Sequence, residues 1–393
     1  MDRARLQLPE GMQDDLPGRL RCLRQQENRF RALFERYGYR EVDTPLLEFM
    51  EVFAHETGNL RQEQLVKSFD HKGRILVVRP EMTAPVVRMV ASRLRGEPLP
   101  LRLCYVAGGI GYDFNGVRGL RQYAQAGVEC LGAPGPEADA EMIALAAELM
   151  QEAGLRNFQL ELGQVEFFKG IMEEAGLTDR EAEEVRRLVE EKNMLAIELM
   201  LKGTASRSVT NRLMQLTMLY GGREVIEEAR KISRHPRCVA ALENVTAILD
   251  TLRAWGLEET VCLDLGMVHD INYYTGMIFR GILPGVGAPV LTGGRYDSLA
   301  GQFGYDIPAT GFAADMRSLL AAAEPGDGGD PLDLVVGWEP GAAGAAFAYM
   351  QRRRAEGLRV ESWLTGEEGL RERAAYRGAR ACLIRANGEE VLQ

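Results

Sequence analysis

Residues 121–131 read RQYAQAGVECL, and this alternation of polar and apolar positions predicts a β-strand with two unlike faces. Side chains two residues apart point to the same side of a strand, so Arg121, Gln125 and Glu129 share one face. Gly127 lies between Gln125 and Glu129 on that face and leaves room for a ligand. A carboxylate and an amide beside a gap suit an ammonium group or an imidazole N–H. The alternative is a solvent-facing strand with ordinary polar residues.

The segments around this strand predict an α+β body. Apolar residues at helical spacing predict helices at 17–38 and 140–153. Residues 178–258 are helical in pattern and rich in charge, which is typical of a helical insertion within a larger domain. Further strands are predicted at 73–79, 101–106, 158–162, 261–266, 274–281 and 288–292.

The composition changes near residue 321. AAAEPGDGGDP, at 321–331, is typical of a linker. Beyond it, strand and helix patterns alternate as β-α-β-α-β over a small α/β unit. We therefore expect a large domain over 1–320, a linker over 321–331 and a small domain over 332–393.

Composition excludes several classes of protein. The formal net charge of −10 argues against non-specific nucleic-acid binding. The six cysteines form no C-x-x-C pair and the four histidines are widely spaced, so no zinc or other metal site is expected. No apolar run is long enough to span a bilayer, and the charged N-terminus lacks the apolar core of a secretory signal. We expect a cytoplasmic protein with reduced thiols and no membrane partner.

A second candidate segment is RPEMT at 79–83. Glu81 and Thr83 follow a predicted strand and are two residues apart, so they could converge on an α-amino group. The alternative is a turn in which Glu81 and Thr83 cap the helix that follows.

A third candidate region combines NYYTG at 272–276 with TGGRYD at 292–297. Tyr273 and Tyr274 beside a glycine, and glycines beside Arg295, indicate backbone packed close to a small ligand. The alternative is that these tyrosines are core residues or cross-strand partners. GGIGYDFNG at 108–116 lacks the G-K-[ST] ending of a phosphate-binding loop and joins two predicted strands, so we discount that function.

Taken in order, the segments resemble class II aminoacyl-tRNA synthetases, and specifically the histidyl-tRNA synthetase family, over roughly residues 8–320. The segments that carry the resemblance are YGYREVDTPLLE (37–48), VVRPEMTAPVVR (77–88), RQYAQAGVE (121–129), MVHDINYYTG (267–276), TGGRYDSLAGQFG (292–304) and IPATGFAADMRSL (307–319). The resemblance implies an antiparallel sheet with flanking helices, and dimerisation through the first of these segments. It also implies that 332–393 is a shortened anticodon-binding-like domain.

The resemblance implies a histidine-binding pocket made of Glu81, Thr83, Arg121, Gln125, Glu129, Tyr273 and Tyr274. Glu81 and Thr83 match the positions that hold the α-amino group in that family. Tyr274, with Tyr273 beside it, matches the pair near the imidazole.

The cations that activate the amino acid are missing. Gly111 stands where the family's second-motif arginine is expected, His269 replaces the loop arginine, and Ser318 replaces the third-motif arginine. Arg317 is one position early, which on a helix turns its side chain by about 100°. Losing one such donor typically costs about 2.7–4 kcal/mol of transition-state stabilisation, so losing three leaves almost no adenylation. Arg121 is retained and could still reach an anion.

A kept pocket with lost arginines is similar to the ATP phosphoribosyltransferase regulatory subunit family. This resemblance implies a regulatory chain without catalytic residues or cofactor. Its partner is a short-form catalytic subunit, which it activates in the first step of histidine biosynthesis. Its effector is histidine, which causes feedback inhibition, and tRNA is not expected as a partner. Two alternatives remain at this point: an active histidyl-tRNA synthetase, or another synthetase-like sensor of histidine or tRNA.

Overall fold

The computed structural model describes residues 6–53, 65–113, 119–202, 205–268, 273–323, 332–365, 367–385 and 388–392. The chain divides into two compact units: Met1–Asp14 with Leu23–Pro325, and Asp15–Cys22 with Gly326–Gln393. In the described ranges, no helix combines the length and the apolar character needed to cross a bilayer.

A large sheet forms the centre of the first unit. Its described strands, from edge to edge, are β1 (Arg40–Glu41), β5 (Leu101–Asp113), β6 (Gly119–Leu131), β12 (Ala309–Asp315), β11 (Leu291–Arg295), β10 (Met277–Ile282), β7 (Gln159–Gln164), β9 (Val261–Asp264) and β8 (Tyr220–Gly221). Neighbours are antiparallel except for β1 with β5 and β7 with β9. The predicted α+β fold with an antiparallel sheet is therefore confirmed.

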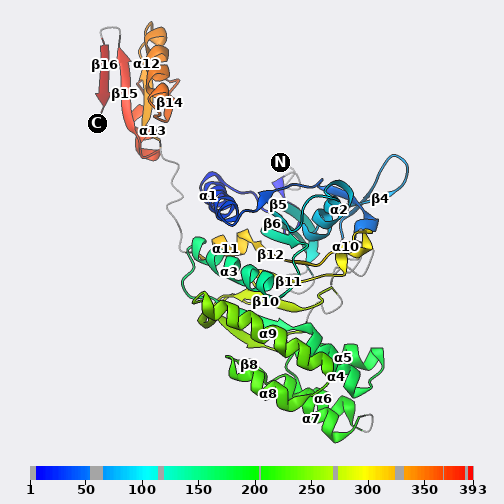
Figure 1. Ribbon diagram of the computed structural model, residues 1–393. Helices are drawn as coiled ribbons and strands as arrows, with labels where there is room; N and C mark the ends of the chain where they lie inside the picture. The colour runs from blue at the N-terminus through cyan, green and yellow to red at the C-terminus, as the bar shows by residue number, and fades with distance from the viewer. Residues whose placement is uncertain are drawn as a thin grey trace. The chain divides into compact units, whose positions relative to one another are not determined.

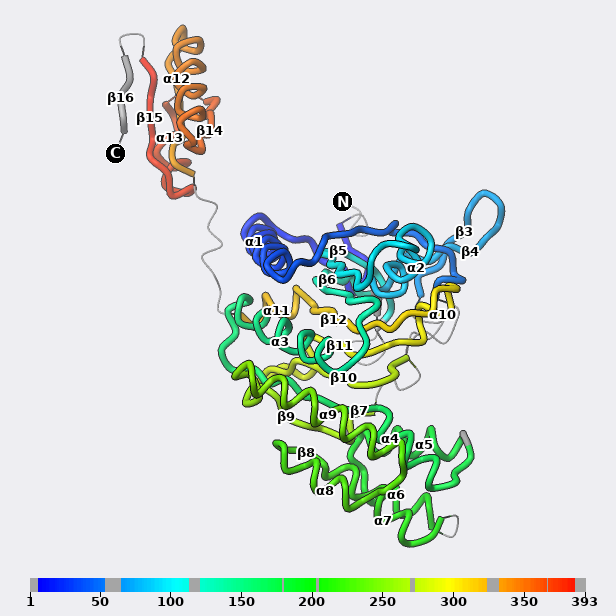
Figure 2. The backbone as a smooth tube through the Cα atoms, viewed as in Figure 1, coloured from blue at the N-terminus to red at the C-terminus, as the bar shows by residue number. Residues whose placement is uncertain are grey.

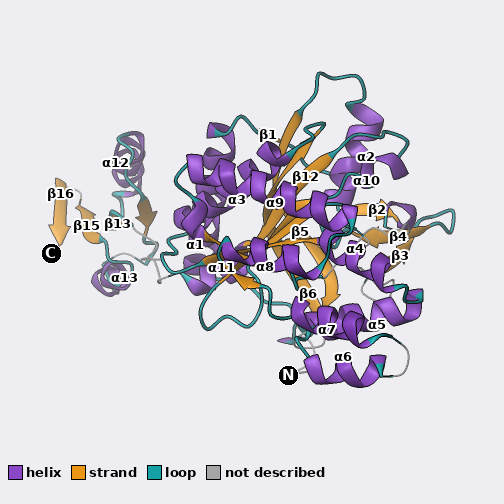
Figure 3. Cartoon of the chain, turned by 60° about the horizontal axis from the view of Figure 1, so that its bottom comes forward, coloured by secondary structure: helices purple, strands orange, loops and turns teal. Residues whose placement is uncertain are grey.

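Helices cover both faces of this sheet. The helices that flank it are α1 (Pro17–Arg36), α2 (Thr83–Arg93), α3 (Pro136–Glu152), α10 (Leu299–Gln302) and α11 (Met316–Ala322). One core joins α1 and α3 to sheet residues such as Val128, and the other joins α2 and α10 to residues such as Leu131. Figure 3 shows α3 and α2 on opposite sides of the strands. Because residues of unlike parity enter the two cores, the side chains of β6 divide cleanly between its faces.

Two predicted helices show how local sequence sets these elements. In α1 the apolar residues Phe30, Leu33 and Phe34 are fully buried, whereas Leu20 is 37% exposed. Gly38 ends the segment with a φ of 78°, which favours glycine. In α3 the burial extends beyond the one predicted stripe, to Ile143 and Ala147. The reason is that α3 packs against the sheet and also against an insertion helix, α9 (Pro236–Ala254).

Helices lie between β7 and β9, where the sequence predicts a helical insertion over 178–258, and they start earlier, at Val165. They comprise α4 (Val165–Ala175), α5 (Asp179–Glu190), α6 (Met194–Leu201), α7 (Arg207–Leu216), α8 (Glu224–Ile232), α9 and the 3-10 helix η4 (Glu258–Thr260). Thr178 and Glu181 form a capping box that starts α5. The trace leaves the sheet after β7 and returns to it at β9 (Figure 2). Figure 1 shows these helices at the opposite end of the large unit from α1 and α2.

Smaller elements complete the two units. A three-stranded antiparallel sheet contains β2 (Leu47–Phe49), β4 (Ile75–Val78) and β3 (Lys67–Phe69), with the 3-10 helix η2 (Met50–Val52) after β2. The second unit contains β13 (Leu334–Trp338), α12 (Ala343–Ala355), β14 (Val360–Ser362), α13 (Leu370–Tyr376), β15 (Arg380–Arg385) and β16 (Gly388–Leu392). Its strands β14, β13 and β15 are parallel, and β16 adds an antiparallel edge that the sequence did not predict.

Several boundaries differ from prediction. β5 continues to Asp113 instead of ending at 106, because Gly109 lets the backbone of Arg79 lie against the strand, where a Cβ would come within 2.5 Å of the Arg79 carbonyl oxygen. β10 starts at Met277, so the tyrosine pair precedes it. Of the predicted linker 321–331, the first two residues belong to α11, and 324–331 lie outside the described residues.

Candidate amino-acid-binding site

The polar face of β6 looks toward α2. Glu129 lies opposite Leu103 of β5 and Gly311 of β12, and Gln125 lies opposite Ala107 and Asp315. Directly paired residues of antiparallel strands point to the same side of a sheet, so this face continues across three strands. The shared face predicted for Arg121, Gln125 and Glu129 agrees with this register.

Glycines let the side chains of the site lie directly on the sheet. A Cβ at Gly127 would come within 2.5 Å of the Tyr105 hydroxyl, and one at Gly311 would clash with the Glu129 carboxylate. A Cβ at Gly294 would come within 2.8 Å of the Tyr274 ring. The space that the sequence assigned to a ligand at Gly127 is therefore filled by Tyr105.

Glu129 is a buried carboxylate held by hydroxyl groups. The residue is only 1% exposed. The Tyr296 hydroxyl donates to Oε2, and the Tyr105 hydroxyl lies 3.3 Å from Oε1. Burial raises the pKa of Glu129 to about 8, and the nearby Glu81 carboxylate adds to this rise, while the hydroxyls of Tyr296 and Thr83 oppose it. Such a group gains most when a ligand brings a positive charge or an N–H donor to it.

Glu81 and Thr83 fulfil the capping alternative and also reach the site. Oε1 of Glu81 accepts from the backbone N–H of Ala84 at 3.1 Å, and Oε2 accepts from that of Thr83. Burial nevertheless raises the pKa of Glu81, because these first-turn amides offset only part of the lost hydration. The Thr83 hydroxyl lowers the pKa of both Glu81 and Glu129 against the effect of burial, so the two carboxylates flank one threonine.

The tyrosine pair closes the site from the loop before β10. Tyr273 stacks on Tyr296, with ring centroids 5.4 Å apart and an angle of 18° between planes. Tyr274 meets Tyr273 edge to face at 4.8 Å, and Lys169 donates to the Tyr274 carbonyl oxygen at 3.2 Å. Burial raises the pKa of Tyr273, and the Glu81 and Glu129 carboxylates add to this rise. The structure thus brings the predicted Glu81, Thr83, Glu129 and tyrosine pair together.

Arg121 lies at the other end of the β6 face, where it forms an ion pair with Asp315. Its guanidinium also lies 5.3 Å from the centroid of the Tyr123 ring. Gln125 is half-buried between this pair and the carboxylates. The predicted Arg121 and Gln125 therefore belong to the same face as Glu129 but not to the tyrosine-lined cluster.

The positions of the missing cations can be compared with this face. Gly111 pairs with Arg121 across β5 and β6, and so contributes no side chain there. Ser318, on α11, uses its hydroxyl to donate to Asp315 at 2.9 Å. His269 lies outside the described residues, as do 270–272 of the same loop and 114–118 after β5.

Sequence reasoning missed Tyr105, Tyr296 and Asp315. Tyr105 became visible only through the register that places it opposite Gly127. Tyr296 belongs to the TGGRYD segment, in which the sequence indicated Arg295 as the candidate residue. That arginine is instead a structural residue, paired with buried Asp139 at 2.8 Å. Cross-strand register was the signal needed, and it is not present in a single sequence.

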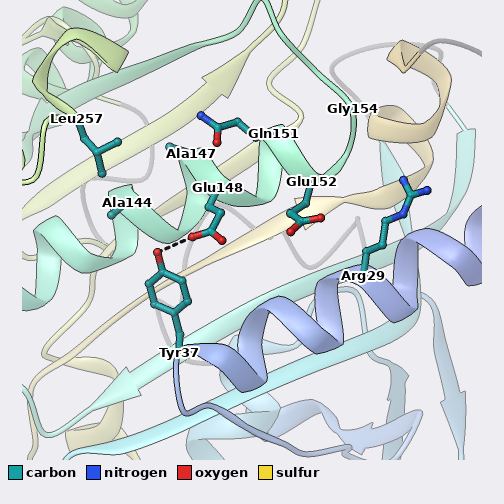
Figure 4. A pocket seen from close by; sticks show the side chains of 9 residues that line it. All are labelled: Arg29, Tyr37, Ala144, Ala147, Glu148, Gln151, Glu152, Gly154 and Leu257. Carbon is teal, nitrogen blue, oxygen red and sulfur yellow. Dashed lines mark hydrogen bonds between the residues drawn. The ribbon is translucent and has the colours of Figure 1, made fainter.

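A separate groove of about 580 Å³ lies between α1 and α3 (Figure 4). Its wall includes Tyr37, whose hydroxyl donates to Glu148 at 2.8 Å, and Glu152, which pairs with Arg36 at 2.7 Å. Burial and the neighbouring Glu148 raise the pKa of Tyr37 to about 12. These polar groups satisfy one another at a helix–helix seam, so we do not assign the ligand to this groove.

The chain is similar to proteins of one family over most of its length. The histidyl-tRNA synthetase family profile matches residues 11–319. The ATP phosphoribosyltransferase regulatory subunit of Acetivibrio thermocellus is 39% identical over 389 residues, covering 98% of this chain and 93% of the relative. The corresponding subunit of Symbiobacterium thermophilum is 40% identical over 391 residues, with coverage of 96% and 95%.

Solved structures agree with this assignment. A protein from Bacillus halodurans C, described as an ATP phosphoribosyltransferase regulatory subunit/histidyl-tRNA synthetase, superposes with a TM-score of 0.86 at 30% identity. The superposition covers 96% of this chain and 97% of that one. Histidyl-tRNA synthetase from Nostoc sp. PCC 7120 gives a TM-score of 0.79 at 18% identity, covering 97% and 92%, and shares the fold. The chain therefore belongs to the family of ATP phosphoribosyltransferase regulatory subunits.

Proposed function

We propose that this chain binds free histidine in the Glu81–Glu129 site and transmits its concentration to a short-form ATP phosphoribosyltransferase catalytic subunit. The observation that carries the proposal is Glu129, a buried carboxylate whose described partners are hydroxyl groups. A histidine imidazole N–H or ammonium group would supply the donor that favours its ionised form. Glu81, which shares Thr83 with Glu129, would receive the second of these two groups.

The proposed role is regulation without catalysis. Adenylation of an amino acid requires cations where negative charge develops on the phosphate. Gly111 and Ser318 supply none at their positions. A pocket that retains groups for recognition while these cations are absent suits a sensor, which needs only a different ligand affinity in two states of its complex. No cofactor is needed for that role.

The catalytic partner is proposed from the names of the relatives. A regulatory subunit acts on a catalytic one, and here we propose activation in the first step of histidine biosynthesis with feedback inhibition by histidine. We also propose self-association through residues 37–48, as the synthetase resemblance implies. Large apolar side chains at and next to this segment, Leu46, Leu47 and Phe49, are 52%, 45% and 38% exposed, which supports an interface there.

Two further assignments complete the proposal. The second unit, with parallel β14, β13 and β15 and helices α12 and α13, is proposed as a shortened anticodon-binding-like domain that does not bind tRNA. The compartment is proposed to be the cytoplasm. All six cysteines are free thiols, five of them buried, which suits a reducing compartment.

Reconstitution tests the function directly. The chain would be mixed with a short-form catalytic subunit, ATP and phosphoribosyl pyrophosphate, and histidine would be titrated. We expect turnover only with both chains, and a fall in turnover as histidine rises. A matched comparison uses Glu129→Gln against Glu198→Gln, which removes the same charge from an exposed position on α6.

Each outcome has a distinct meaning. Activation without histidine sensitivity in Glu129→Gln, with normal sensitivity in Glu198→Gln, would support the site. Intact sensitivity in Glu129→Gln would remove the site assignment. No activation at any ratio of competent subunits would remove the regulatory role. Histidine-dependent exchange of pyrophosphate with ATP would instead support synthetase activity.

A further inference from the structure

A free amino acid carries a carboxylate as well as an amine, and the carboxylate needs a partner in the proposed site. Glu81 and Glu129 would both repel it. Arg121 is the arginine on the polar face of β6, and its guanidinium is paired with Asp315 of β12. Asp315 lies directly opposite Gln125, which is four residues along β6 from Glu129. The carboxylate that pairs with Arg121 is therefore on the same face as the acidic cluster, at the level of Gln125.

The distance along the strand suits one ligand molecule. Glu129 and Gln125 are four residues apart, which is roughly 13 Å at the usual rise of a strand. Free histidine spans about 6 Å from a ring nitrogen to its carboxylate by standard bond lengths. Two hydrogen bonds add about 3 Å each. A histidine whose imidazole meets Glu129 would therefore bring its carboxylate to the level of Gln125 and Asp315.

Asp315 does not depend on Arg121 alone. Its Oδ1 accepts from the backbone N–H of Arg317 at 3.0 Å and lies 3.5 Å from that of Ser318. Its Oδ2 accepts from the Ser318 hydroxyl at 2.9 Å. Asp315 thus caps α11, and its negative charge keeps three donors if the guanidinium turns away. If a ligand carboxylate takes the place of Asp315 as the partner of Arg121, the Asp315 carboxylate therefore still has hydrogen-bond donors.

Arg121 can exchange partners at low cost. Its side chain is 41% exposed and that of Asp315 is 16% exposed, and ion pairs near solvent contribute little to stability. The nearby Tyr123 ring lies 5.3 Å from the guanidinium and adds a cation–π contact that does not depend on Asp315. A ligand carboxylate and the Asp315 carboxylate offer the same geometry to a planar guanidinium, so they compete for it.

We propose that Asp315 is a built-in competitor for the carboxylate of the ligand, and that histidine binding transfers Arg121 from Asp315 to that carboxylate. The proposal rests on the proposed function and adds the residue pair that selects a free amino acid over analogues without the carboxylate. Histidinol, which has a hydroxymethyl group in its place, is the natural probe. The exchange also loosens a tie between β6 and the β12–α11 junction when the ligand arrives.

Titration calorimetry on the full chain, with histidine and histidinol as separate probes, tests the exchange. Arg121→Gln is expected to weaken histidine binding at least tenfold and histidinol binding less than twofold. Asp315→Asn keeps a capping side chain and removes the competing charge, so histidine is expected to bind several-fold more tightly and histidinol unchanged. Arg121→Lys is expected to keep part of the preference for histidine. Arg187→Gln on α5 is the control, because it breaks an exposed pair with Glu191 and should change the affinity for neither ligand.

The outcomes separate this proposal from the one it rests on. Equal losses for both ligands in Arg121→Gln would show that the ion pair is structural only, and weaker histidine binding in Asp315→Asn would overturn the competition. A normal histidine affinity with an unchanged ratio in Arg121→Gln would overturn this proposal alone. Absence of histidine binding by the unaltered chain would overturn the proposed function and this proposal together.

Discussion

The two ends of the polar face of β6 differ in burial and in the charge of the side chain that each carries. At the Glu129 end, a carboxylate is buried among hydroxyl groups and lies directly against a glycine of the next strand. At the Arg121 end, a guanidinium is half-exposed and already paired with Asp315. Among the described contacts, the Glu129 carboxylate has no positively charged partner, whereas the Arg121 guanidinium already has a negatively charged one. Recognition of an amino acid and its activation are therefore proposed to be separable in this fold. The first end would hold the imidazole and ammonium groups of the ligand, and the second would reach the ligand only through its carboxylate.

The difference between the two ends is tested most severely by removing the charge of Glu129, at the buried or closed end of the face. Glu129→Gln keeps the volume of the side chain and the hydroxyl neighbours, but it cannot become an anion. We expect histidine affinity to fall about 100-fold, equivalent to roughly 2.7 kcal/mol at the usual conversion. Calorimetric titration of the full chain measures this. Arg121→Gln should lose less, so a larger loss at Arg121 would reverse the ranking of the two ends.

Packing at the closed end provides the next test. In Gly127→Ala the new Cβ would lie 2.5 Å from the Tyr105 hydroxyl and from the Phe312 carbonyl oxygen. Overpacking of this kind costs about 1–3 kcal/mol, which urea unfolding would measure. Gly344→Ala is the matched control, because its Cβ would meet no atom within 4 Å and it lies in α12. That control should be neutral or stabilising by up to about 1 kcal/mol. Equal effects of the two changes would mean that the floor of the site is not closely packed.

The pKa of Glu129 predicts a pH dependence of stability. Burial raises this pKa from an ordinary value of 4.5 to about 8 in the folded chain. A folded state with the higher pKa binds more protons than the unfolded state, so this contribution is complete below 4.5 and is lost as pH rises toward 8. Between these values, the free energy of unfolding should fall by about 1.4 kcal/mol per pH unit relative to Glu129→Gln.

Urea unfolding of both proteins near pH 6 and pH 7.5 checks this slope. The comparison with Glu129→Gln cancels the contributions of groups that do not interact with Glu129. Saturating histidine should reduce the slope, because its N–H donors favour the ionised carboxylate. Parallel pH profiles for the two proteins would contradict the assignment of a raised pKa to Glu129.

The sequence could predict which residues share a face of β6, but not which residues of other strands lie opposite them. Parity along one strand was enough to place Arg121, Gln125 and Glu129 on one face. The β6 register with β5 and β12 was not predictable, because it depends on pairing between segments distant in the chain. For that reason Tyr105 and Asp315 were missed, and Gly127 was interpreted as an empty space. The segment with the glycines of 108–111 was predicted to join two strands, but the approach of Arg79 makes these residues part of β5.

The smallest expected effect comes from returning one cation to the open end. Gly111→Arg places a guanidinium opposite Arg121 on the ladder, yet we expect no histidine-dependent exchange of pyrophosphate with ATP. Positions 269 and 318 still carry histidine and serine, and Asp315 still places a carboxylate on this face where phosphate charge would develop. One donor typically supplies only about 2.7–4 kcal/mol of the stabilisation required. Measurable exchange in this single variant would mean that the open end is nearly complete, and the separation of recognition from activation along β6 would no longer hold.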